Sequence, residues 1–96
     1  MIPELKQKPD NWAQEAMKIL RPGMILYGFC AGFFGRNSYS DKRIVGVSVL
    51  HIEDNGPILQ IDVYEDGYEN RAMCTSEKDV KDLINSSNEN MEDENG

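Results

Sequence analysis

Two short turn sequences constrain the fold of this chain more than any other feature. Asp54–Gly56 and Glu65–Gly67 each end in glycine, which accepts the positive φ that a tight hairpin turn requires. The flanking segments 43–53, 58–64 and 68–74 are short and are bounded by these turns, as strands are. Strands joined by tight turns pair antiparallel, so the second half of the chain is predicted to form three consecutive antiparallel strands.

Side-chain alternation supports the same interpretation. Leu59, Ile61 and Val63 fall on one face of the middle strand, with polar residues between them. Gly46 interrupts the longest strand and is predicted to mark a bend or bulge, where one strand serves two faces. The continuous apolar run 24–30 adds a first strand ahead of the other three.

A helix is predicted at each end of this sheet. The first begins at Asn11, which forms a capping-box pattern with Gln14, and the second begins at Ser76, with Asp79 as the acidic partner. Each carries an apolar stripe at helical spacing that can face the sheet. The stripes are Trp12, Ala16, Ile19 and Leu20 in the first helix, and Val80, Leu83 and Ile84 in the second.

The fold class that follows is α+β and mostly β. We expect a four-stranded antiparallel curled sheet or an SH3-like small barrel, flanked by an N-terminal and a C-terminal helix. A chain of 96 residues has room for one domain. We expect residues 1–8 to be a flexible lead, residues 9–85 the single globular domain, and residues 86–96 a disordered acidic tail, since Met91 is its one apolar residue.

The charge distribution limits the kinds of partner. The net charge is −7, and residues 76–96 contribute −5 of it, with two lysines against seven carboxylates. Nucleic acid and anionic membrane are therefore disfavoured as partners. No apolar run approaches the roughly 20 residues that span a bilayer, and the N-terminus lacks the pattern of a signal peptide. We expect a cytoplasmic protein with no membrane partner.

The residues that usually carry chemistry are few and scattered. Cys30 and Cys74 lie in apolar contexts and are predicted to be buried free thiols on strands. The one histidine, His51, lies within a predicted strand, and no Cys-x-x-Cys spacing occurs, so no metal site or cofactor is expected. No nucleophile with a base beside it is visible, and the chain is predicted not to be an enzyme.

The segment 32–43, which follows the first predicted strand, is the candidate binding site. Gly32 and Gly35 can turn backbone N–H groups toward an anion, while aromatic rings can stack on a partner and cations can contact acidic groups. The candidate binding residues are Phe33, Phe34, Arg36, Ser38, Tyr39, Lys42 and Arg43. The alternative is that Phe33 or Phe34 folds back to cap the core and the glycines only allow the chain to turn.

The run Leu20–Met24, the loop Gly28–Tyr39 and the pair Lys42-Arg43 resemble a pattern in small, uncharacterised bacteriophage-encoded proteins. The shared loop reads Gly-Phe-x-x-Gly-x-Phe-Gly-Arg-x-Ser-Tyr, and the resemblance covers roughly residues 20–47. It implies a phage or prophage accessory protein and brings no known activity or catalytic residue.

Three functions are compatible with these features. The first is a non-enzymatic binding module whose loop contacts a host or phage protein. The second is a nucleic-acid-binding small barrel that uses the same loop. The third is an acidic mimic of nucleic acid that inhibits a host enzyme through the C-terminal carboxylates. The sequence does not indicate an oligomeric state.

Overall fold

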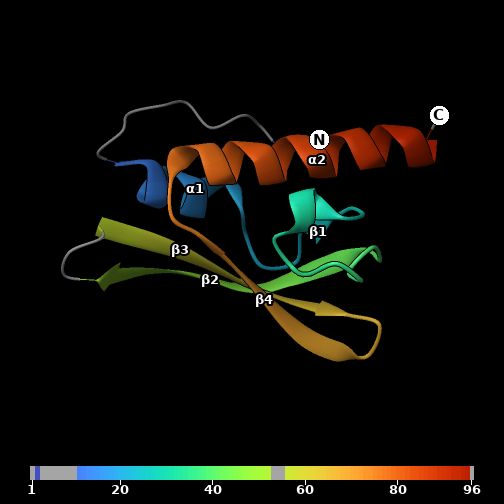
Figure 1. Cartoon of the computed structure of the whole chain (residues 1–96), viewed down its shortest axis with the longest axis horizontal. Helices are drawn as coiled ribbons and strands as arrows, with labels where there is room; N and C mark the ends of the chain where they lie inside the picture. Colours follow the sequence, from blue (N-terminus) through green and yellow to red (C-terminus); the bar gives the residue numbers. More distant parts are fainter. Residues whose placement is uncertain (1, 3–10, 53–55, 96) are drawn as a thin grey trace.

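The computed structural model describes residue 2, residues 11–52 and residues 56–95. Four strands form one antiparallel sheet in the order β1-β2-β3-β4, which curls into a half-barrel with both helices on one side (Figure 1). This confirms the predicted α+β, mostly β fold. The elements in chain order are α1 (Trp12–Ile19), β1 (Ile25–Leu26), the 3-10 turn η2 (Cys30–Gly32), β2 (Lys42–Ile52), β3 (Gly56–Glu65), β4 (Tyr68–Cys74) and α2 (Glu77–Asn95).

The hairpins form where the turn sequences predict them. Glu65 pairs with Tyr68 across β3 and β4, and the two residues between them have positive φ (Asp66 46°, Gly67 88°), as a type I′ turn requires. Ile52 pairs with Gly56 across β2 and β3, while the rest of the predicted turn, Asp54 and Asn55, lies outside the described residues.

The predicted bulge is also present. The β2–β3 register shifts between Ile44 and Gly46. Even-numbered residues of β2 therefore face the core before the bulge, and odd-numbered residues face it afterwards. This lets one long strand follow the curl of the half-barrel.

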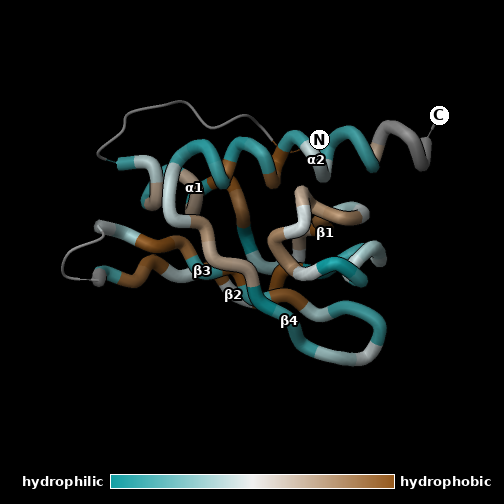
Figure 2. The backbone as a smooth tube through the Cα atoms, in the orientation of Figure 1, coloured by the Kyte–Doolittle hydropathy of each residue, from teal (hydrophilic) through white to brown (hydrophobic). Residues whose placement is uncertain are grey.

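The core lies between the inner face of the sheet and the two helices. The predicted inward residues of β3 and α2 are all buried, and Trp12 anchors α1 with 6% of its surface exposed. Figure 2 shows hydrophobic residues along β2 and β3, in the layer below the two helices. The central members of this core are Trp12, Leu20, Leu26, Ile44, Leu59, Ile61, Val63, Val80, Leu83 and Ile84.

The two helix starts differ. The amide of Asp79 donates to Ser76 Oγ at 3.3 Å, which confirms the predicted cap of α2. Asn11 makes no side-chain cap bond, so the predicted capping box of α1 is wrong, and the helix begins at Trp12. Burial of Trp12 and the two alanines behind it supplies the stability that the cap does not. Neither helix in the described ranges is long and apolar enough to cross a bilayer.

The predicted first strand, 24–30, is mostly wrong. Only Ile25 and Leu26 pair with β2. Gly28, Cys30 and Ala31 then have φ of 70°, 53° and 55°, a left-handed backbone that cannot continue a strand. Cys30 therefore lies on η2 and not on a strand.

Both cysteines are buried free thiols, as predicted. Burial raises the pKa of Cys30 to about 11 and that of Cys74, on β4, to about 12. Neither side chain is a reactive thiolate near neutral pH.

The predicted disorder of residues 86–96 is wrong for residues 86–95, because α2 continues to Asn95. The polar side chains of this stretch bond the backbone that leaves β1. Ser87 Oγ accepts from the Tyr27 amide and Ser86 Oγ from the Ala31 amide, both at 3.0 Å. Asn90 Nδ2 donates to the Tyr27 carbonyl at 2.8 Å. Backbone groups without a strand partner are thereby satisfied.

The predicted flexible lead is described only at Ile2. This residue is buried. Its backbone N–H donates to Asn88 Oδ1, and its carbonyl accepts from Asn88 Nδ2, both at 3.0 Å. The other residues of the lead lie outside the described ranges. Ile2 thus lies against the polar half of α2.

Candidate functional site

Lys42 is fully buried on the inner face of β2 and fastens the loop from inside. Its Nζ donates to the carbonyls of Gly28 at 2.6 Å and of Ser38 and Ser40 at 2.7 Å each. An ammonium has three donors, so all are used. The Nζ atom also lies 5.5 Å from the centre of the Phe34 ring, a cation–π distance.

Glu65, at the end of β3, complements this cation. It is 2% exposed, and its carboxylate accepts from Ser38 Oγ at 2.7 Å, Ser40 Oγ at 3.1 Å and Asn70 Nδ2 at 3.0 Å. Ser38 and Ser40 therefore each give a carbonyl to Lys42 and a hydroxyl to Glu65. We call these five residues the Lys42–Glu65 network.

The network controls the protonation of Glu65. Burial alone would raise the pKa of this carboxyl, but hydrogen bonds from Ser38, Asn70 and Ser40 and the nearby charge of Lys42 outweigh it. The pKa of Glu65 is consequently lower than its ordinary value, so the residue is an anion at neutral pH.

The backbone of the loop forms no anion-binding nest. The amides of Gly32 and Gly35, predicted to converge on an anion, donate instead to the carbonyls of Phe29 and Gly32, both at 3.1 Å. They hold consecutive turns of the loop. The nest prediction is therefore wrong.

Four of the seven predicted binding residues pack within the protein. Phe34, Ser38 and Lys42 are buried, and Phe33 is half-buried against the core. The expected alternative, in which the phenylalanines cap the core, accounts for both rings. Lys42, expected among the cations that contact a partner, lies instead in the interior.

Three predicted residues stay on the surface. Tyr39 is 66% exposed, and its ring stacks on Phe29 with centroids 4.8 Å apart and planes 18° apart. Arg36 is exposed three residues away. Arg43 is exposed on β2, and its guanidinium lies over the Tyr64 ring, 6.0 Å from the ring centre. We call Phe29, Arg36 and Tyr39 the loop platform.

Sequence reasoning missed Glu65 and Asn70 as site residues and misplaced Lys42. Strand alternation contains the signal that would have found them, because residues two apart share a face. The relevant pairs are Lys42 with Ile44, Glu65 with Val63, and Asn70 with Ala72, in which the apolar member is buried in each case.

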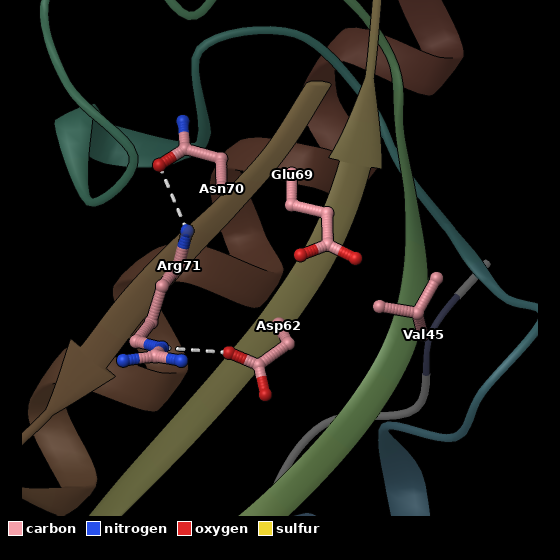
Figure 3. A pocket seen from close by; sticks show the side chains of 5 residues that line it. All are labelled: Val45, Asp62, Glu69, Asn70 and Arg71. Atoms are coloured by element: carbon pink, nitrogen blue, oxygen red, sulfur yellow. Dashed lines mark hydrogen bonds and ion pairs between the residues drawn. The ribbon is translucent and has the colours of Figure 1, made fainter. Parts of the chain in front are cut away.

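A hollow of about 440 Å³ lies on the outer face of the sheet, and Asn70 is common to this hollow and to the Lys42–Glu65 network (Figure 3). Its lining residues are Val45, Asp62, Glu69, Asn70 and Arg71. Arg71 Nε bonds Asp62 Oδ1 at 2.8 Å, and the Arg71 amide donates to Asn70 Oδ1 at 2.8 Å. No group of three or more metal-ligating side chains occurs within the described ranges, and His51 is exposed on β2.

The fold and site together define a small α+β half-barrel whose long loop is fixed by buried polar side chains. No protein-family model, no curated protein and no solved structure matches this chain.

Proposed function

We propose that the chain is a small non-enzymatic binding module that contacts a protein partner through the loop platform. The observation that carries this proposal is the contrast between the two sides of the loop. Lys42 fixes it from inside with three hydrogen bonds, while Tyr39 is 66% exposed outside. The stacking contact with Phe29 leaves most of the Tyr39 ring open to a partner.

The chemistry of the platform suits a protein surface. Tyrosine and arginine are enriched among the residues that dominate binding energy at protein interfaces. A loop already held in its bound shape loses less conformational entropy on binding. The net charge of −7 works against nucleic acid as the partner. The resemblance to phage-encoded proteins suggests a host or phage protein, acting in the cytoplasm.

The test is capture of a partner from a bacterial lysate by the full chain and by variants. We expect the Arg36→Ala, Tyr39→Ala double variant to lose the captured protein, with its thermal midpoint changed by no more than about 4 °C. Matched controls are Lys18→Ala and Met17→Ala, an exposed cation and a part-exposed apolar residue on α1, outside the platform and the Lys42–Glu65 network. Equal capture by the double variant, or equal loss in the controls, would contradict the proposal.

A further inference from the structure

The outer face of the sheet has no covering element among the described residues. Both helices lie on the opposite side (Figure 1). Large apolar side chains are nevertheless part-exposed on this outer face: Val45 by 45%, Leu50 by 38%, Tyr64 by 43% and Met73 by 45%. The register places Tyr64 and Val45 at one end of the face and Met73 and Leu50 toward the other, with the Arg71–Asp62 ion pair between them. A face of mixed apolar and charged side chains is typical of a weak interface.

One row of residues across this face carries a distinctive charge pattern. Arg43 pairs with Tyr64 in the β2–β3 register, and Tyr64 pairs with Glu69 in the β3–β4 register. A cation and a carboxylate therefore flank a central tyrosine, each about 5 Å from it along the row. Arg43 stacks over Tyr64, and Glu69 is exposed with no ion-pair partner in the described ranges.

We propose that a second copy of this chain docks on this face, about a two-fold axis that runs along β3 over Tyr64. Such a rotation exchanges the positions of β2 and β4. Arg43 of each copy then lies over Glu69 of the other, and the two Tyr64 rings meet at the axis. The hollow beside Glu69 has room for the incoming guanidinium, and the Arg71 cation that also lines it is already paired with Asp62 (Figure 3).

Charge favours a second copy over an unrelated partner. Two-fold interfaces must be self-complementary, and the row Arg43–Tyr64–Glu69 is. Asp62, which would face its own copy near the axis, is already paired with Arg71. The chain as a whole carries −7 and repels its copies, whereas this row is neutral. The outer face is therefore where two copies can approach.

Face-to-face docking is also favoured over extension of the sheet at β4. Hydrogen bonds of an antiparallel strand alternate in direction, and the register from the Glu65–Tyr68 closing pair points the Arg71 amide away from β3. Asn70 Oδ1 already accepts from that amide at 2.8 Å. The centre of the β4 edge is thus closed to a further strand.

The size of the face sets the expected strength. Three strands about 4.8 Å apart and about seven residues long cover roughly 330 Å² per copy. Stable complexes bury about 800 Å² per partner. We therefore expect a weak dimer, with a dissociation constant on the order of 100 μM.

The test is sedimentation velocity of the full chain from about 10 μM to about 1 mM at low salt. We expect the wild type to dimerise, and Arg43→Glu and Glu69→Arg each to remain monomeric. An equimolar mixture of these two variants should associate again, because it places opposite charges at positions 43 and 69 in both contacts. Lys18→Glu and Glu89→Arg make the same charge changes away from the face and should dimerise like the wild type.

A monomeric wild type at about 1 mM would overturn the proposal, as would single variants that dimerise normally or a mixture that stays monomeric. Amide NMR shifts of the wild type on dilution need no substitution, and they should change at 43, 64 and 69; changes confined to other elements would also overturn it. The Arg36→Ala, Tyr39→Ala variant should dimerise normally, which separates this face from the loop platform.

Discussion

The sharpest test of the loop's construction is Lys42→Met. Methionine keeps the apolar length of the side chain, so little cavity is created, but it removes all three hydrogen bonds of Nζ. The bond to Ser38 O is buried, and those to Gly28 O and Ser40 O are partly buried. The perturbation is therefore confined to the polar contacts and to the charge that faces Glu65.

The magnitude follows from those contacts. A buried acceptor left without a donor costs about 1–3 kcal/mol, and the two partly buried carbonyls can regain part of this from water. Glu65 loses a nearby positive charge but keeps its hydrogen bonds from Ser38, Ser40 and Asn70, so the unpaired carbonyls dominate the cost. We expect Lys42→Met to lower the free energy of unfolding by about 2–4 kcal/mol, against about 5–15 kcal/mol for a whole domain.

Urea denaturation followed by fluorescence of Trp12, the one tryptophan and 6% exposed, measures this loss. Lys78→Met is the matched control, since Lys78 is an exposed lysine paired with Asp82, and it should leave the midpoint nearly unchanged. In a double-mutant cycle, Glu65→Gln should cost less in the Lys42→Met background than in the wild type. A loss below about 1 kcal/mol for Lys42→Met, or additive effects in the cycle, would refute the reasoning.

Two further predictions concern the same loop. The pKa of folded Glu65 lies below its ordinary value of 4.5. The stabilisation from the ionised carboxylate is therefore complete above that pH and is lost as the pH falls through the folded pKa. In an acid titration, the unfolding free energy should decline more steeply below about pH 4.5 in the wild type than in Glu65→Gln, and parallel curves would contradict this prediction. Gly28→Ala should lower the free energy of unfolding by about 2–4 kcal/mol, because φ is +70° and the new Cβ would overlap the Asn90 amide. Gly23→Ala, with φ +95° but open space around the new Cβ, should lower it by about 1–2 kcal/mol in the same urea assay. Equal losses of unfolding free energy in the two variants would contradict the role of Asn90.

The sheet was predictable because its signals are local. The type I′ turn at Asp66 and Gly67, the bulge at Gly46 and the buried alternation of Leu59, Ile61 and Val63 each depend on a few adjacent residues. The sheet formed by β2, β3 and β4 follows from them. The candidate site depends on contacts between segments far apart in sequence, such as Ser38 with Glu65, which no local pattern specifies.

The C-terminal stretch shows how composition can mislead. Serine, asparagine and glutamate bury too little apolar surface to fold alone, which is why residues 86–95 suggested disorder. Ser86, Ser87 and Asn90 instead bond backbone groups of residues 27–31. The same kinds of side chain that hydrate a disordered tail serve here as hydrogen-bond partners for loop backbone groups at residues 27 and 31, which the turns within the loop do not bond.

These contacts share one cause, the shortness of β1. Because only Ile25 and Leu26 pair with β2, the chain from residue 27 to 41 cannot be held by a strand ladder, and its backbone groups need other partners. Lys42 supplies them from the sheet and the polar face of α2 supplies them from the helix layer. The buried charge and the polar helix end therefore act on the same segment from two sides. The position of Tyr39 on the surface depends on both, so the Lys42→Met substitution should weaken partner capture as well as stability, although Lys42 itself lies out of reach of any partner.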